Sequence, residues 1–149
     1  MPEGLAPGVH RFPVADPIHR YLVAGSGPVC VVNPGRCRAD REYRRMPALE
    51  DCLTMVYLAA ADGPELSVDA QVRLLRAVVS QLGDQPPLIF GDGSGCRAAM
   101  TFALHHPELV AGLILYRSAV DPVDLQALPA EVPLLIIDPP SGFLGCDVA

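Results

Sequence analysis

The chain contains no lysine and no tryptophan, and only 19% of its residues are charged. All eleven basic residues are arginines, which indicates a GC-rich bacterial coding sequence, and seventeen acidic residues bring the net charge to −6. Nucleic-acid binding needs a surplus of positive charge, so this balance excludes that class of partner. No apolar run reaches the roughly 18 residues of a membrane span, and the N-terminus lacks a signal-peptide pattern. We therefore expect a cytoplasmic protein that does not associate with membranes.

The sequence also lacks the spacing of metal ligands. Five cysteines are scattered along the chain, and none of the four histidines has a ligand partner at a suitable distance in sequence. The cysteines are Cys30, Cys37, Cys52, Cys96 and Cys146. We expect reduced thiols that pack as small hydrophobic side chains, with no metal and no cofactor.

Apolar segments alternate with helical patterns along residues 1–149, which predicts one α/β domain with a mostly parallel sheet covered on both faces. The predicted strands are 9–14, 19–24, 29–32, 53–60, 88–90, 113–116 and 134–137, and the predicted helices are 40–49, 67–83, 96–106 and 121–128. The first two strands form an antiparallel hairpin. The high mean hydropathy of +0.30 leaves two alternatives, a dense core or an apolar surface covered by another subunit.

Residues 88–96, Leu-Ile-Phe-Gly-Asp-Gly-Ser-Gly-Cys, predict a strand that runs directly into a tight glycine turn and then a helix. This layout is typical of a nucleophile elbow, which needs small residues two before, two after and three after its apex. Gly91, Gly95 and Cys96 occupy those positions, so Gly93 lies at the apex. Glycine has no side chain with which to attack a substrate. A dinucleotide-binding fingerprint is disfavoured because its third glycine would fall at Cys96.

From about residue 9 to residue 140, the order of segments resembles the α/β-hydrolase family. The resemblance is carried by the hairpin start, by the strand–elbow–helix segment, by Ala-Leu-His-His-Pro-Glu-Leu-Val-Ala-Gly-Leu-Ile-Leu at 103–115, and by Val-Pro-Leu-Leu-Ile-Ile at 132–137. It implies a three-layer fold with helices on both faces of a mostly parallel sheet and an N-terminal antiparallel hairpin. Parallel sheets bind ligands at the carboxyl ends of their strands, so we expect the functional edge to be lined by the turns at 33–38, 59–63, 91–96, 117–121 and 138–142.

The chain departs from the family pattern at several positions of the catalytic machinery. Gly93 replaces the nucleophile, and Asn33-Pro34-Gly35 stands where the family has His-Gly and an oxyanion residue. Ala-Ala-Ala-Asp-Gly at 59–63 replaces an Asp-x-Arg-Gly turn. The chain ends before the segment that would carry the catalytic histidine, and residues 117–131 leave no room for a lid. We therefore expect a minimal fold that lacks the lid and the final strand and helix.

Three side chains remain as candidate catalytic groups. Asp92 precedes the apex, Ser94 follows it, and Asp138 lies just beyond the last predicted strand, earlier than the position at which the resemblance places the family acid. Each also has a simpler interpretation. A carboxylate at position 92 is favourable beside a helix N-terminus, and Ser94 can cap the helix that begins there. Cys96 occupies a position that must be small, which favours packing over reactivity.

Backbone groups form a second kind of candidate site, because an oxyanion hole needs no side chain. The N–H of Ser94, together with one from Gly35 or Arg36, could hold a carbonyl or carboxylate oxygen at the start of the helix. Pro34 has no N–H to donate. The candidate ligand-binding residues are Gly35, Arg36, Gly93, Ser94 and Gly95. The alternative is a vestigial crevice filled with water. Arg36 belongs to a group of five arginines within residues 36–45, which would attract an anionic ligand or simply form a solvated surface.

These observations favour a degenerate α/β-hydrolase-like protein without a Ser-His-Asp triad, in which ordinary serine-hydrolase activity is not expected. The leading hypothesis is a non-hydrolytic binding or accessory protein for a small carbonyl-bearing ligand or a partner enzyme. The alternative is a lyase, isomerase or cyclase of bacterial secondary metabolism that uses aspartate and backbone donors, or a site completed by another subunit. An uncovered sheet edge after the last strand predicts a homodimer or a complex with another protein.

Overall fold

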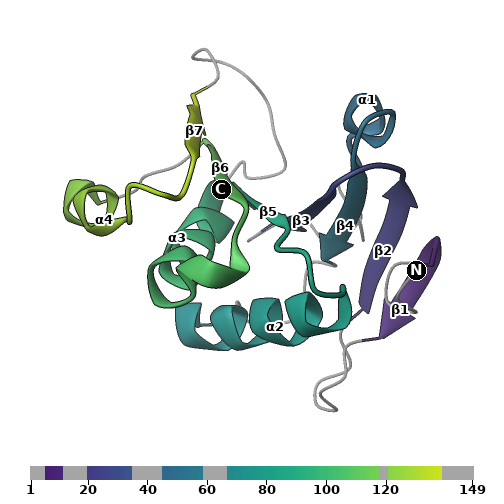
Figure 1. Ribbon diagram of the computed structural model, residues 1–149, viewed down its shortest axis with the longest axis horizontal. Coiled ribbons are helices and arrows are strands. Elements are labelled where there is room, and N and C mark those ends of the chain that lie inside the picture. The colour runs from purple at the N-terminus through teal and green to yellow at the C-terminus, as the bar shows by residue number, and fades with distance from the viewer. Residues whose placement is uncertain (1–5, 12–19, 35–44, 59–66, 118–120, 139–149) are drawn as a thin grey trace.

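The computed structural model describes residues 6–11, 20–34, 45–58, 67–117 and 121–138. They form one seven-stranded sheet in the order β1-β2-β4-β3-β5-β6-β7 (Figure 1). The strands are β1 (Gly8–Arg11), β2 (Arg20–Gly25), β3 (Val29–Asn33), β4 (Thr54–Leu58), β5 (Leu88–Asp92), β6 (Gly112–Tyr116) and β7 (Leu134–Ile137). The helices are α1 (Pro47–Glu50), α2 (Val68–Gln81), α3 (Cys96–His105) and α4 (Pro122–Ala127), with short 3-10 turns η2 (Gly93–Gly95) and η3 (Pro107–Leu109).

The sheet is mostly parallel with an antiparallel N-terminal edge. β1 pairs with β2 and β2 with β4 in antiparallel orientation, whereas β4, β3, β5, β6 and β7 are parallel neighbours. This confirms the predicted fold class, including the antiparallel hairpin start. The turn of that hairpin falls at 12–19 and lies outside the described residues. None of the helices in the described segments is long and apolar enough to cross a membrane.

The helix boundaries follow local sequence signals. Ser67 caps α2, because its side chain accepts a hydrogen bond from the Ala70 N–H at 3.1 Å, and Gly83 follows the helix with φ +99°. Asp121 caps α4 in the same way. The helix expected at 40–49 is confirmed only from Pro47, where α1 begins; residues 45–46 are not helical, and 40–44 lie outside the described residues. Proline favours the first helical position, where its missing N–H breaks no hydrogen bond.

The two faces of the sheet are covered unequally. α2 and α3 lie together on one face, where they bury the large core that includes Val31, Leu75, Ile89 and Phe102 (Figure 1). The opposite face buries a smaller cluster around Met55, and there the four-residue α1 packs against β2 and β4. The thick helical layer fixes the carboxyl ends of β3, β5 and β6, where the candidate site lies.

Candidate functional site

The predicted elbow is present at the carboxyl end of β5. The strand ends at Asp92, η2 turns the chain over three residues, and α3 begins at Cys96. Gly93 has φ +57°, in the left-handed region that glycine adopts at little cost and other residues avoid. Gly93 is partly exposed, whereas Gly95 is buried. The apex is therefore a glycine whose backbone has the conformation that a sharp strand-to-helix turn requires.

Close contact between β5 and α3 explains the small residue two positions before the apex. A Cβ atom on Gly91 would lie 2.8 Å from the Cα of Cys96 and 3.0 Å from the Cβ of Ala99. The strand and the first turn of the helix thus meet almost backbone to backbone. Only glycine allows this approach, so the turn is held rigidly by the packing beneath it.

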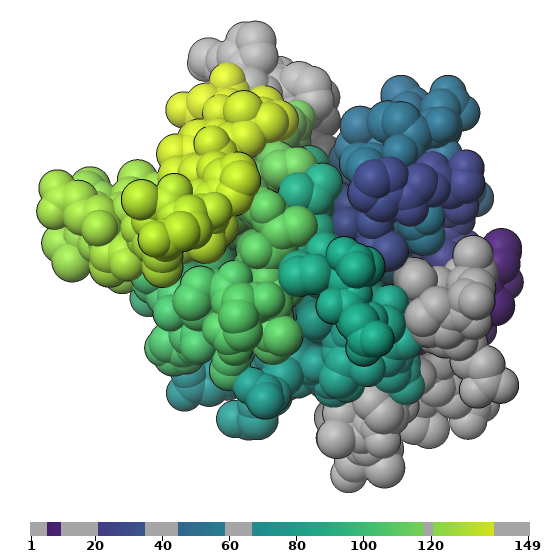
Figure 2. Space-filling view, in the orientation of Figure 1, coloured from purple at the N-terminus to yellow at the C-terminus, as the bar shows by residue number. Residues whose placement is uncertain are grey.

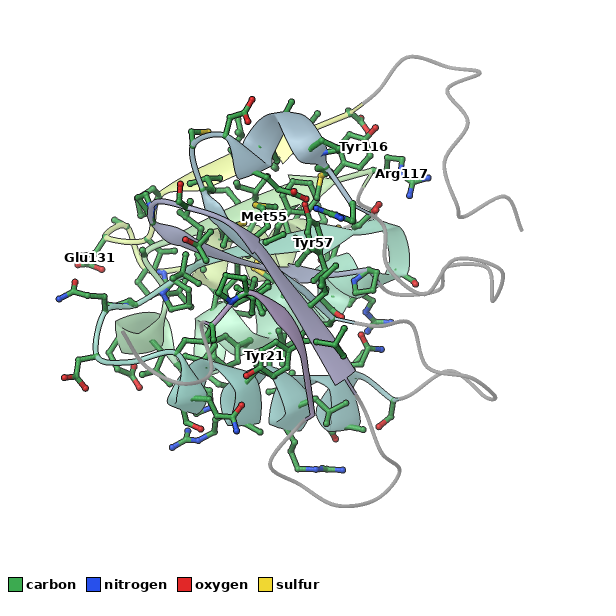
Figure 3. All side chains as sticks on the ribbon, turned by 90° about the vertical axis from the view of Figure 1, so that its right-hand side faces the viewer. Tyr21, Met55, Tyr57, Tyr116, Arg117 and Glu131 are labelled. Carbon is green, nitrogen blue, oxygen red and sulfur yellow. The ribbon has the colours of Figure 1, made fainter. Side chains whose placement is uncertain are left out.

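Asp92 forms a buried ion pair with Arg117, which follows β6. The Asp92 carboxylate oxygen Oδ1 accepts from Nη2 at 2.6 Å and from Nε at 3.2 Å, and the two side chains are 4% and 9% exposed. Arg117 lies beside Tyr116 at the sheet edge (Figure 3), with its guanidinium 5.3 Å from the centre of that ring. Its backbone N–H donates to the Ile137 carbonyl at 2.9 Å. The negative charge of Asp92, a candidate catalytic group, is therefore balanced by the positive charge of Arg117.

The sequence analysis did not single out Arg117, although this residue directly follows the predicted strand 113–116, at the end of the sheet where ligands bind. β5 and β6 are parallel neighbours in a register that pairs Asp92 with Tyr116, so residue 117 follows beside the carboxylate. Arg117 also has φ +57°, which is uncommon for a residue with a side chain and costs of order 1–3 kcal/mol. The ion pair and the hydrogen bond to β7 hold this conformation in place.

A buried amide network fastens the other side of the elbow. The Asn33 side-chain amide donates to Oε1 of Gln71 and to the carbonyl oxygen of Gly95, both at 3.1 Å. Both amide side chains are buried. This network joins β3, α2 and η2, and it satisfies polar groups that burial would otherwise penalise. Asn33, noted in the sequence only as a replacement for histidine, therefore anchors the turn.

The Cys96 thiol is a packing group. Its Sγ lies 3.2 Å from the Gly91 carbonyl oxygen and 3.5 Å from the Tyr116 carbonyl oxygen, so both accept from its single S–H, and burial raises the pKa of the thiol to about 11. Burial likewise raises the pKa of Cys30 to about 12. Both groups stay protonated at neutral pH, and a thiol is a poor nucleophile.

We expect alkylation to distinguish the cysteines of the described segments. Iodoacetamide at pH 8 should modify the exposed Cys52 within minutes, whereas Cys30 and Cys96 should react at least tenfold more slowly in the folded protein. Peptide mass mapping measures each site, and the same mapping in urea provides the unprotected rates. Rapid modification of Cys96 in the native protein would contradict its assignment as a packing group.

The remaining candidates are dispersed. Ser94 is exposed, and the N-cap of α3 is Gly95, not Ser94. Asp138 is exposed and follows β7. Because β6 lies between β7 and β5, Asp138 is about 10 Å from the end of β5, two strand spacings away. Gly35 and Arg36 lie outside the described residues. In the described segments, no group of three or more histidine, cysteine or acidic side chains could hold a metal ion.

A cavity of about 210 Å³ lies at the opposite end of the sheet. Arg76, Asp84 and Glu108 are among its lining residues, and its loops precede β5 and β6. It is therefore at the amino ends of the strands and shares no residue with the elbow.

Comparison with solved structures identifies the architecture as the α/β-hydrolase fold. A protein from Pseudomonas aeruginosa that is provisionally assigned as an epoxide hydrolase matches with a TM-score of 0.60 and 24% identity, over 80% of this chain and 47% of that one. A serine hydrolase involved in carbazole degradation matches with a TM-score of 0.61 and 23% identity, over 80% and 51%. A membrane phospholipase A, described as a bacterial virulence factor, matches with a TM-score of 0.59 and 22% identity, over 75% and 40%.

These similarities define the fold alone, and the chain spans about half the length of the solved structures that it matches. No family model and no curated protein sequence matches it. The predicted resemblance to α/β hydrolases is confirmed at the level of fold, and the activities of those longer enzymes do not transfer with it.

Proposed function

We propose that this chain is a non-hydrolytic α/β-hydrolase-fold protein that binds a small ligand through a carbonyl or carboxylate oxygen at the Gly93 elbow. The observation that carries the proposal is the left-handed φ of +57° at Gly93, in a strand–turn–helix segment with no side chain at its apex. Gly93 has no nucleophilic side chain, so it cannot form an acyl-enzyme. Backbone N–H groups at the start of α3 can still donate to a negatively polarised oxygen.

The neighbouring side chains support binding over covalent chemistry. Arg117 neutralises Asp92, and Cys96 keeps its proton because burial raises the pKa of the thiol to about 11. Buried interactions hold the turn from both neighbouring strands. The Asp92–Arg117 pair links it to the end of β6, and the Asn33 amide network links it to β3. A preorganised backbone loses little entropy when it takes up a ligand, which favours binding.

The alternative function is a lyase, isomerase or cyclase. Its candidate side chains lie at the carboxyl end of the sheet: Asp92 ends β5, Ser94 lies in η2 and Asp138 follows β7. A carboxylate there could transfer a proton while backbone donors stabilise an enolate.

Two substitutions at position 94 test the binding proposal. Ser94→Pro removes the backbone N–H after the apex, in the first turn where proline is tolerated, whereas Ser94→Ala removes only the hydroxyl. We expect wild type and Ser94→Ala to bind butyrate with the same affinity, and Ser94→Pro to lose at least tenfold. Titration of ¹⁵N-labelled protein measures the affinity through the amide shifts of residues 93–96.

Other outcomes separate the hypotheses. Absence of butyrate-dependent shifts at residues 93–96 in the wild type would contradict an oxyanion-binding elbow. Turnover of p-nitrophenyl butyrate with a burst, lost in Ser94→Ala, would instead identify a serine nucleophile and defeat the proposal. Proton exchange from a carbonyl compound that is lost in Asp92→Asn or Asp138→Asn would favour the alternative enzyme.

A further inference from the structure

Asp92 places a full negative charge next to the backbone donors of the elbow. Asp92 and Ser94 are two residues apart, so their Cα atoms lie at most about 7 Å from each other. At a comparable separation, and with an effective dielectric constant of about 20, an unpaired carboxylate would weaken the binding of a second negative charge by a factor on the order of 50. The ligand that this elbow accepts therefore depends on how the charge of Asp92 is balanced.

Arg117 balances that charge at close range. Its Nε and Nη2 both donate to Oδ1 of Asp92, at 3.2 and 2.6 Å, and the two side chains are 9% and 4% exposed. Solvent ions screen such a buried pair much less than they screen a surface pair. The two charges thus cancel each other locally, at the point where the parallel strands β5 and β6 end side by side.

Stability alone does not account for this pair. A buried ion pair generally stabilises a fold no more than well-packed apolar side chains of similar volume. Arg117 also has φ +57°, which is unfavourable for a residue with a side chain, and its N–H bonds the Ile137 carbonyl of β7. Figure 2 shows β7, in yellow, beside the green surface of the α3–β6 segment. Backbone strain of this kind is concentrated at functional sites, and here it adjoins the elbow.

The other charges described around the elbow are positive. The start of α3 carries the partial positive charge of a helix N-terminus, its first turn contains no acidic side chain, and Arg97 is exposed there. Cys96 adds no negative charge, because burial raises the pKa of its thiol to about 11. With Asp92 balanced by Arg117, the described groups next to Gly93 favour a negatively charged ligand.

We propose that the Asp92–Arg117 pair makes the elbow selective for a carboxylate over a neutral carbonyl group. This inference rests on the proposed function, because it specifies the ligand of the same backbone site. Arg117 is a positioning residue that acts through Asp92: it holds the Asp92 charge in a neutral pair, so a ligand carboxylate approaches the Ser94 N–H without repulsion. Hydrogen bonds to an ionised acceptor are roughly twice as strong as neutral ones. The ligand class is therefore a small organic acid.

Paired titrations with butyrate and butyramide test this selectivity, since the two molecules have nearly the same shape and differ in charge. Amide shifts of residues 93–96 in ¹⁵N-labelled protein at pH 7 give both affinities. We expect the wild type to bind butyrate at least fivefold more tightly than butyramide. Asp92→Asn leaves the Arg117 charge unbalanced and should raise this ratio at least tenfold, whereas Arg117→Gln leaves Asp92 unbalanced and should lower it at least threefold.

The ratio separates charge selection from a merely structural role. Loosening of the elbow in either variant weakens both ligands together and cancels in the ratio. The double variant Asp92→Asn with Arg117→Gln removes both charges, so its ratio should return to within threefold of the wild type. Arg76→Gln changes the net charge as Arg117→Gln does, but it lies in the cavity at the opposite end of the sheet and should leave the ratio unchanged.

The failure of this inference can be told apart from the failure of the proposed function. Shifts with neither ligand would defeat the proposed function, and the selectivity with it. Shifts with both ligands but a wild-type ratio of one or less would overturn the selectivity alone, and this result needs no variant to fold. Folded single variants that both keep the wild-type ratio would overturn it as well, because the pair would then not be sensed by the ligand.

Discussion

Replacement of Asp92 by alanine is expected to lower the free energy of unfolding by about 3 kcal/mol or more, because it strands a charged arginine in the protein interior. The Asp92 and Arg117 side chains are 4% and 9% exposed, so water cannot replace the lost carboxylate without local opening. The substitution also releases Arg117 from the pair that supports its φ of +57°. Urea unfolding followed by far-ultraviolet circular dichroism measures the change.

The Arg45–Glu50 pair provides a matched control. Its Nη2–Oε1 distance is 2.6 Å, equal to the shortest distance in the Asp92–Arg117 pair, but Arg45 is half exposed. Solvent screens such a pair, so Arg45→Ala should shift the urea midpoint much less than Asp92→Ala does. Equal effects of the two substitutions would contradict the importance of burial at Asp92.

A double variant separates pairing from packing. Asp92→Ala with Arg117→Ala removes the stranded charge, so its loss of stability should be smaller than the sum of the two single losses. Strict additivity would mean that the two side chains act independently, and the elbow would then lack its electrostatic support from β6.

Hydrophobic periodicity was sufficient to predict the sheet, because each buried strand is a short apolar run between turn residues. The 88–96 segment even located the turn, since the need for glycine at position 91 and the positive φ of Gly93 are local constraints on chain geometry. The candidate side chains could not be judged in the same way. Their roles depend on partners 25 or more residues away, and a single sequence does not show which polar groups meet.

Arg117 and Asn33 illustrate that difference. Asp92 contacts Arg117 because the parallel strands β5 and β6 lie side by side. Asn33 donates to the Gly95 carbonyl, 62 residues further along the chain. Each contact joins the elbow to a different strand of the sheet. Asp92 and Asn33 therefore hold the turn, and the function that we propose assigns ligand contact to the backbone around Gly93.

The close approach of β5 and α3 leads to the second large effect. Gly91→Ala should destabilise the protein by about 3 kcal/mol, because the new Cβ would lie 2.8 Å from the Cα of Cys96 and 3.0 Å from the Cβ of Ala99. Neither atom belongs to a side chain that can rotate away. The first turn of α3 must therefore move outward, and it carries the Ser94 N–H with it.

Gly112→Ala is the appropriate control, since Gly112 begins the neighbouring strand β6 and a Cβ there would meet Leu88 Cδ2 at 2.9 Å. That methyl group ends a flexible side chain, and the next contacts, with Pro133, are ordinary at 3.6 and 3.7 Å. Both substitutions restrict the unfolded chain equally, so this contribution cancels in the comparison. We expect Gly112→Ala to cost no more than about 1 kcal/mol in urea unfolding.

Thiol reactivity adds a local readout to the same pair of variants. The Cys96 Sγ donates to the Gly91 carbonyl, and its slow alkylation depends on burial beneath the elbow. An outward shift of α3 should expose that sulfur, so Gly91→Ala should accelerate modification of Cys96 by iodoacetamide while Gly112→Ala leaves the rate unchanged. If Gly91→Ala is as stable as Gly112→Ala and Cys96 remains protected, then the elbow is not held by contact between β5 and α3, and a rigid backbone site at Gly93 loses its structural basis.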